Sequence, residues 1–333
     1  MISREMFLLG SNRSVIREIF EYSKKRAAEI GAENVFDFSI GNPNVPAPEG
    51  VHQAVRELLE SEDDIYLHGY TSAQGDAGVR NAIAENLNQR FGTDFKAENL
   101  YMTCGAAASL KICITALREE GDEFITFTPF FPEYRVFVET AGAKLVPVST
   151  NPDSFQINFE RLDEAINEHT KAVIVNSPNN PSGVVFQEET VKKLAEMLKT
   201  KAHRYGHPIY LIADEPYREL VYDGTEVPYM TKYYANTLVC YSYSKSLSLP
   251  GERIGYILVP DAVDESAMVY AAVCGAGRAL GFVCAPSLFQ HVIERCVGQV
   301  SDLSVYKKNR DLLYNGLTAS GYRCVKPDGA FYL

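Results

Sequence analysis

Short apolar runs separated by helical patterns constrain the fold of this chain more than any other feature. They fall between Glu123 and Val259 and consist almost wholly of apolar residues: 124–127, 172–175, 209–213, 238–241 and 254–259. Continuous apolar strands that alternate with amphipathic helices are typical of a mostly parallel sheet buried on both faces. We therefore predict an α/β fold in which helices cover both faces of a mostly parallel central sheet.

Helical spacing of apolar residues predicts several helices outside these runs. One pattern extends from Arg13 to Ile30. Further patterns predict helices at about 50–60, 76–91 and 106–118. A proline-punctuated stretch, 41–48, predicts a rigid linker after the first helix.

Composition and charge narrow the class of protein. The chain has 333 residues, enough for one large domain and a smaller one. Its net charge is −11, and no run is rich in Lys or Arg, so we expect no nucleic-acid partner. The longest weakly polar run, 267–277, is too short to span a bilayer, so we expect no membrane partner either.

The cysteine pattern points to a reducing compartment. The seven cysteines include no Cys-x-x-Cys pair, which favours free thiols over a disulfide framework or a metal site. The N-terminal residues lack the apolar core of a signal peptide. We therefore predict a cytoplasmic protein without a bound metal.

The segment from Ser242 to Arg253 carries the clearest chemical signal. Lys245 lies among hydroxyl residues, and an arginine follows eight positions later. A lysine amine can form a Schiff base with an aldehyde cofactor. Serine hydroxyls and a guanidinium can hold a phosphate. Taken alone, the segment also fits a polar loop with a surface lysine.

Other motifs follow one another in a telling order along the chain. These are Ser177-Pro178-Asn179-Asn180-Pro181-Ser182-Gly183, then Ala213-Asp214-Glu215-Pro216-Tyr217, then Lys245, then Arg253. Together they resemble the fold-type I aminotransferases of class I/II, the aspartate aminotransferase-like enzymes that depend on pyridoxal phosphate (PLP). The resemblance extends from about Ser39 to the last residue. It implies the three-layer PLP-transferase fold with an additional smaller α+β domain.

The resemblance assigns catalytic roles to residues near the strand ends. Lys245 would be the Schiff-base lysine, which also moves a proton between the substrate Cα and the cofactor. Asp214 would keep the pyridine nitrogen protonated, so that the ring accepts electrons. Tyr217 and Asn180 would donate hydrogen bonds to the phenolic oxygen of the cofactor.

It also assigns the remaining contacts with cofactor and substrate. The residues expected around the cofactor phosphate are Gly105, Ala106, Ala107, Ser242, Ser244 and Arg253. Phe131 would stack on the pyridine ring. Tyr70 would reach the phosphate of the partner subunit in a homodimer. Gly41 and Asn180 would face the substrate carboxylate.

Arg278 has two readings. It can bind the distal carboxylate of a dicarboxylic donor, or it can form a structural salt bridge or an interface contact. The local match to relatives is poor, so the sequence leaves this choice open.

The resemblance also predicts the domain organisation. Residues 1–45 would form an N-terminal arm and part of the small domain, 46–290 the large PLP-binding domain, and 291–333 the start of the small domain. Relatives continue for several tens of residues past this point, where an arginine binds the substrate α-carboxylate. Since no residue here matches that arginine, we expect an incomplete small domain and a truncated chain.

The predicted function is transfer of an amino group from an L-amino acid to a 2-oxo acid, with 2-oxoglutarate as the expected acceptor. A PLP-dependent carbon–sulfur lyase of the same fold and a non-catalytic ligand-sensing domain remain alternatives. Only transamination leaves the amino group on the cofactor, which separates the three. A nicotinamide dehydrogenase fits poorly, because no Gly-x-Gly-x-x-Gly follows a strand.

Overall fold

The computed structural model describes residues 2–11 and 15–333 and divides the chain into two compact units, 1–44 and 45–333. The first unit contains helices α1 (Arg4–Ser11) and α2 (Val15–Ile30) and the 3-10 helix η1 (Ala32–Asn34). Helix α2 confirms most of the first predicted helix, whereas Arg13 lies outside the described residues.

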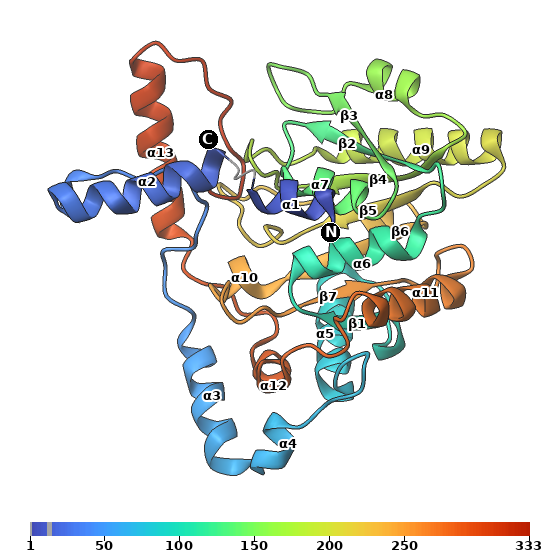
Figure 1. The fold of residues 1–333 in the computed structure, drawn as a ribbon, viewed down its shortest axis with the longest axis horizontal. Helices are drawn as coiled ribbons and strands as arrows, with labels where there is room; N and C mark the ends of the chain where they lie inside the picture. Colours follow the sequence, from blue (N-terminus) through green and yellow to red (C-terminus); the bar gives the residue numbers. More distant parts are fainter. Residues whose placement is uncertain (1, 12–14) are drawn as a thin grey trace. The chain divides into compact units, whose positions relative to one another are not determined.

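A seven-stranded sheet forms the centre of the second unit (Figure 1). Its strands are β1 (Leu100–Thr103), β2 (Glu123–Thr128), β3 (Lys144–Ser149), β4 (Thr170–Asn176), β5 (Tyr210–Asp214), β6 (Thr237–Ser242) and β7 (Gly255–Leu258). The strand order is β1-β7-β6-β5-β4-β2-β3, and β7 is antiparallel to both of its neighbours. The five predicted apolar runs are confirmed as β2, β4, β5, β6 and β7. Strands β1 and β3 were not predicted.

Helices cover both faces of this sheet, as the sequence predicts. The helices of the second unit are α3 (Glu49–Ser61), α4 (Asp64–His68), α5 (Ala77–Phe91), α6 (Ala106–Leu117), α7 (Glu133–Glu139), α8 (Phe159–Ala165), α9 (Glu188–Tyr205), α10 (Tyr243–Ser246), α11 (Ser266–Ala279), α12 (Ser287–Cys296) and α13 (Ser304–Ala319), with short 3-10 turns η2 (Ala97–Asn99) and η3 (Met230–Lys232). Residues of α5, α8, α9 and α12 pack on one face, and residues of α6, α7 and α11 on the other.

Strand β4 shows why these strands are apolar at every position. Ala172 and Ile174 belong to the core under α6, α7 and α11, whereas Val173 and Val175 belong to the core on the opposite face. Successive side chains of a strand point to opposite faces, so a strand covered on both sides needs apolar residues throughout. Burial of each large aliphatic side chain contributes about 1.5–3 kcal/mol.

Several polar residues meet at one edge of the sheet because of the strand directions. The parallel strands β4, β5 and β6 end at Asn176, Asp214 and Ser242. Strand β7 runs the other way, so the segment that enters it, with Arg253, lies beside the end of β6. Ligands of open α/β sheets bind at this edge.

None of the helices in the described part of the chain is long and apolar enough to cross a membrane. The predicted boundaries of the large and small domains, at residues 46, 290 and 333, stay a prediction.

Candidate active site

Asp214 occupies the most unusual environment at this edge. Its side chain is buried at the end of β5, and the hydroxyl of Tyr134 donates to its Oδ2. Its Oδ1 has no hydrogen-bond partner among the described residues. Burial raises the pKa of Asp214 to about 7, although the hydrogen bond from Tyr134 opposes the rise. A buried acceptor without a donor is costly, so Oδ1 is a natural position for a ligand N–H.

Asn176 connects Asp214 to the turn that carries Asn180. The buried side-chain amide of Asn176 donates to the Asp214 carbonyl oxygen at 2.8 Å, and its Oδ1 accepts from the backbone N–H of Asn180 at 2.6 Å. One side chain therefore fixes the backbones of two predicted site residues. Sequence reasoning missed this residue, although a polar residue that ends a buried apolar strand is a usable signal.

Lys245 lies in the short helix α10, which begins directly after β6. The Ser242 hydroxyl caps this helix by accepting from the Ser244 N–H at 3.1 Å. The Lys245 Nζ is 5.1 Å from the centre of the Phe331 ring and 6.0 Å from that of Tyr217. The pKa of Lys245 is lowered to about 8, mainly because the amine is buried and secondly because of the positive charge of Arg253.

The hydroxyl of Tyr217 lies next to a second buried phenol. Its distance from the Tyr332 hydroxyl is 2.7 Å. Burial is the largest cause that raises the pKa of Tyr217 well above its ordinary value, and the contact with Tyr332 raises it further. A hydrogen bond with the Asn180 side chain opposes the rise. The structure thus brings Tyr217 and Asn180 together, and it adds Tyr332, which sequence reasoning missed.

The predicted phosphate ligands converge at the start of α6. Gly105 caps this helix with a φ of +88°, and a Cβ at that position would lie 2.9 Å from the Arg253 Nη2. Only glycine combines this backbone conformation with so close a guanidinium. The first amides of α6, from Ala106 and Ala107, have no acceptors within the helix. The hydroxyls of Ser242 and Ser244 lie 2.6 Å apart.

Phe131 packs against Tyr134, the residue whose hydroxyl donates to the Asp214 carboxyl. The half-buried ring of Phe131 meets the Tyr134 ring edge-on, with 5.7 Å between ring centres. Tyr134 follows Phe131 by three residues, in helix α7. The sequence signal for Tyr134 is a polar aromatic residue about one helical turn after the predicted stacking residue Phe131.

These residues fit pyridoxal phosphate. A buried acceptor oxygen suits a protonated ring nitrogen, and an amine of lowered pKa suits an aldehyde. Helix amides, hydroxyls and a guanidinium together suit a phosphate dianion. The fit rests on the unpartnered Oδ1 of Asp214 and on the chemistry of the surrounding donors.

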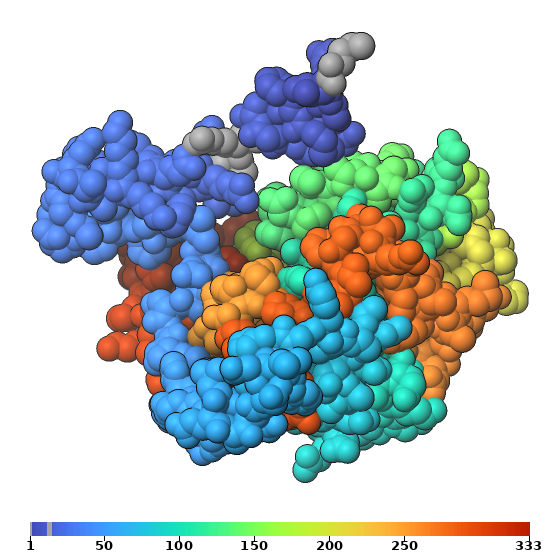
Figure 2. Space-filling model, turned by 60° about the horizontal axis from the view of Figure 1, so that its bottom comes forward, coloured from blue at the N-terminus to red at the C-terminus, as the bar shows by residue number. Residues whose placement is uncertain are grey.

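Tyr70 is not part of this group. Its side chain is 100% exposed. The next residue, Thr71, is anchored by Gln290, whose Nε2 donates to the Thr71 Oγ1 at 3.2 Å, and by the Cys284 thiol. In Figure 2 the light-blue surface around residues 50–75 adjoins the orange surface that follows α11.

Gly41 and Arg278 are the two other predicted substrate residues. Gly41 belongs to the first unit, 1–44, and its role stays a prediction. Arg278 is exposed in the last turn of α11 and forms no ion pair with any residue that the structure describes.

A buried charge network lies directly beside Asp214. The Arg218 Nη1 donates to the Glu215 Oε2 at 2.9 Å, its Nε donates to Glu219 at 3.1 Å, and its Nη2 donates to the Tyr256 hydroxyl at 3.3 Å. Arg218, Glu215 and Glu219 are all nearly inaccessible to solvent. Unlike Asp214, these carboxylates have their charge partner within the protein.

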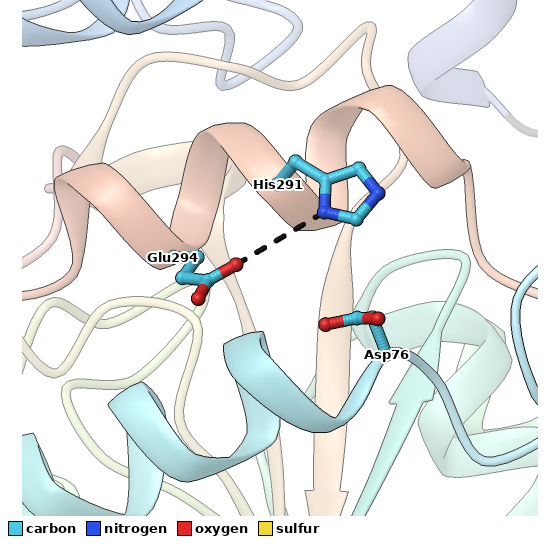
Figure 3. Close-up of side chains that lie close together, drawn as sticks. All are labelled: Asp76, His291 and Glu294. Carbon is cyan, nitrogen blue, oxygen red and sulfur yellow. Dashed lines mark ion pairs between the residues drawn. The ribbon is translucent and has the colours of Figure 1, made fainter. Parts of the chain in front are cut away.

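A second polar cluster joins α5 and α12 (Figure 3). His291 and Glu294 come from α12 and Asp76 precedes α5, with three potential ligand atoms within 4.8 Å of one another. Asp76 already accepts from the Gly78 N–H at 2.7 Å as the cap of α5. The Nδ1 of His291 lies 3.3 Å from the Tyr66 hydroxyl. The Nε2 of His291 has no hydrogen-bond partner among the described residues, and we assign no ligand to the cluster.

Comparisons with known proteins agree with the fold. The family model for aminotransferase class I and II matches residues 33–333. A probable aspartate/prephenate aminotransferase of Thermus aquaticus is 32% identical over 318 residues, which are 92% of this chain and 79% of that protein.

Solved structures give the same result. An amino transferase from Eubacterium rectale is 63% identical, with a TM-score of 0.97, and the match covers 99% of this chain and 83% of the other. The aspartate aminotransferase of Thermus thermophilus, solved with maleate, is 26% identical, with a TM-score of 0.82 over 99% of this chain and 84% of the other.

The mostly parallel sheet covered by helices on both faces, together with the family match, places the chain in the fold-type I class. The chain belongs to the class I and II aminotransferase family, and it is an enzyme of the aminotransferase class. This family is known to use pyridoxal phosphate.

Proposed function

We propose that this aminotransferase holds pyridoxal phosphate on Lys245 and moves an amino group from an L-amino acid to a 2-oxo acid. The observation that carries the proposal is the unpartnered Oδ1 of buried Asp214, at the strand end next to the one that leads to Lys245. Bound pyridoxal phosphate supplies an electron sink for the electrons left when a proton leaves the Cα of an amino acid.

Lys245 has the properties of both a nucleophile and a base. With a pKa of about 8, a substantial fraction of its amine is neutral at slightly alkaline pH. A neutral Nζ can attack an aldehyde, and it can also take up the Cα proton and return it. The aromatic rings of Tyr217 and Phe331 exclude water around it.

The other residues would orient the cofactor. Asp214 Oδ1 would accept from the ring N–H, and the positive charge of that N–H would stabilise the ionised carboxylate. Tyr217 and Asn180 would donate to the phenolic oxygen, and Phe131 would pack on the ring. The backbone amides of Gly105, Ala106 and Ala107 at the start of α6, the hydroxyls of Ser242 and Ser244, and Arg253 would hold the phosphate.

We further propose dicarboxylic substrates, with aspartate or glutamate as donor and 2-oxoglutarate as acceptor. Support comes from relatives named aspartate aminotransferases and from the maleate in the Thermus thermophilus structure. Gly41 and Asn180 would contact the α-carboxylate. The exposed Arg278, without an ion-pair partner in the described part of the chain, is available to the distal carboxylate of a substrate bound in the partner subunit.

The proposed active unit is a cytoplasmic homodimer. Full exposure of Tyr70 supports a role outside its own subunit, because a phenol that contacts the cofactor of the same chain would be partly covered. Mixing Tyr70→Phe subunits with Lys245→Ala subunits should restore activity, since hybrid dimers contain one unmutated site. If the mixture stays inactive, Tyr70 acts within its own subunit.

Borohydride reduction tests the central assignment. Reduction of the PLP-loaded protein and peptide mapping should place the pyridoxyl label on Lys245. Lys111 is the matched control, because it is also half-buried and its Nζ donates to the Phe137 carbonyl at 2.9 Å. A label on Lys111 or on another lysine would contradict the proposal.

A half-reaction separates the proposed activity from the alternatives. The PLP-loaded protein is incubated with ¹⁵N-labelled aspartate and then freed of small molecules. An aminotransferase retains the label on the cofactor and releases it when 2-oxoglutarate is added. A lyase releases labelled ammonia instead, and a sensing domain retains no transferred label.

A further inference from the structure

The Tyr217–Tyr332 hydroxyl pair is the least expected contact near Lys245. The two oxygens lie 2.7 Å apart, and the rings meet nearly at right angles, with 5.6 Å between their centres. Either hydroxyl can donate across this contact. Burial raises the pKa of both phenols, so both keep their protons at neutral pH.

Backbone hydrogen bonds hold the segment with Tyr332 in place. The Ala330 N–H donates to the Leu220 carbonyl at 2.8 Å, and the Gly329 N–H donates to the Gly183 carbonyl at 2.9 Å. The Tyr222 hydroxyl donates to the Ala330 carbonyl. The segment is therefore tied both to the loop of Tyr217 and to the turn of Asn180, so the position of Tyr332 is built into the fold.

A phenol has one proton, so Tyr217 cannot donate to two acceptors at once. The proposed function requires the Tyr217 proton for the phenolic oxygen of pyridoxal phosphate. We infer that Tyr332 is a positioning residue, which then donates to the Tyr217 oxygen and directs the Tyr217 proton toward the cofactor. This inference rests on the proposed function. The added donor is Tyr332, which would act on the Tyr217 hydroxyl and would not itself contact the cofactor.

The consequence is a chain of two hydrogen bonds that ends on the phenolic oxygen. Successive hydrogen bonds polarise one another, so donation by Tyr332 makes Tyr217 a stronger donor. A stronger donor favours negative charge on the phenolic oxygen. The pH at which the PLP-loaded protein changes its absorbance should therefore depend on Tyr332.

The experiment is an absorbance titration of PLP-loaded Tyr332→Phe between about pH 5 and pH 10. We expect the absorbance pKa to rise by about 0.5–1 unit, the effect of losing one hydrogen bond. In a Tyr217→Phe background, Tyr332→Phe should add no further shift, because the chain is already broken. An equal shift in that background would overturn the inference.

Binding to the ligand-free protein gives a second measurement. Tyr332→Phe should weaken binding of pyridoxal phosphate about three- to tenfold and leave unchanged the binding of an analogue that lacks the phenolic oxygen. Tyr222→Phe is the control, since it removes a buried hydroxyl from the same cluster whose hydrogen bond goes to the Ala330 carbonyl. An equal absorbance shift in this control would show that displacement of the segment is the cause, against the inference.

The two levels of proposal can fail separately. If borohydride labels Lys245 and the absorbance pKa of Tyr332→Phe equals that of the wild type, the positioning role is wrong and the proposed function stands. If Lys245 takes no label, both are wrong.

Discussion

Asp214 and Glu215 are adjacent and both buried, but they differ in their hydrogen-bond and charge partners. Glu215 accepts from the buried guanidinium of Arg218 at 2.9 Å. Among the residues that the structure describes, only the neutral hydroxyl of Tyr134 donates to the Asp214 carboxyl, and Oδ1 has no partner. Burial raises the pKa of both carboxyls, but only Glu215 has a nearby positive charge that opposes the rise.

The difference separates a structural carboxylate from a ligand-binding one. A buried charge is tolerated when the protein supplies its partner. A buried carboxyl whose partner is missing costs stability until a ligand supplies the donor. The contrast predicts that Glu215 and its network support the ligand-free fold, and that Asp214 supports the reaction.

The largest expected effect comes from Asp214→Ala. Activity with saturating pyridoxal phosphate should fall by several orders of magnitude, because the ring nitrogen loses its carboxylate. The urea midpoint of the ligand-free variant at pH 8 should equal or exceed that of the wild type, since a poorly compensated buried charge has been removed. Rates near those of the wild type would end the assignment.

Arg218→Ala should produce the opposite pattern. It leaves the buried carboxylate of Glu215 without its salt-bridge partner, whereas Glu219 keeps its ion pair with Arg90. The free energy of unfolding of the ligand-free protein should therefore fall by roughly 3–5 kcal/mol. Urea unfolding at pH 7 measures this. Arg56→Ala, which breaks the exposed pair with Glu49, is the control and should leave the midpoint unchanged. An equally small effect of Arg218→Ala would remove the contrast with Asp214.

The pH dependence of stability should sharpen the comparison. The folded-state pKa of Asp214, about 7, lies above the ordinary 3.8, so the folded protein binds more protons between these values. The contribution of Asp214 is therefore present below pH 4 and is lost as the pH rises through 7. Relative to Asp214→Asn, the ligand-free wild type should lose up to about 4 kcal/mol of unfolding free energy over this range.

Loading with pyridoxal phosphate provides the control for this titration. A positive N–H opposite Oδ1 stabilises the ionised carboxylate, so the loss should become much smaller. Parallel curves for wild type and Asp214→Asn in the absence of the cofactor would contradict the raised pKa.

Tyr134→Phe should have the smallest effect. The Tyr134 hydroxyl stabilises the ionised form of Asp214, so its removal should move the midpoint of the stability titration upward by about 0.5–1 pH unit. Tyr101→Phe, which loses a hydrogen bond to the Phe282 carbonyl, is the control and should leave that midpoint in place. A downward shift in Tyr134→Phe would show that the phenol favours the protonated carboxyl.

The sequence predicted the central strands well because burial on both faces makes them apolar at every position. Strand β3 was missed for a physical reason. It is the edge strand, and its burial alternates, with Lys144 exposed and Leu145 buried. Strand β1 has only four residues, too few for a clear pattern. The antiparallel direction of β7 depends on tertiary pairing, which the pattern of apolar residues does not encode.

For the site, the motifs pointed to the residues that we propose carry the chemistry, but not to the residues that hold them in place. Lys245, Asp214 and Asn180 fall in recognisable segments. Asn176, Tyr134 and Tyr332 act through hydrogen bonds to partners 4 to 115 positions away in the sequence. Such contacts depend on the folded chain, and the residue types involved are common in any buried core.

The placement of β7 between β1 and β6 also sets an order of assembly. Among the described strands, β1 pairs with β7 alone, and Leu100 lies opposite Leu258. During synthesis, β1 and helix α6 leave the ribosome long before this partner exists, and pairing over such a distance is slow. The end of the sheet where we propose that the phosphate binds is therefore completed only once β7 has been synthesised. A phosphate ligand that binds there would stabilise only chains in which β7 has paired.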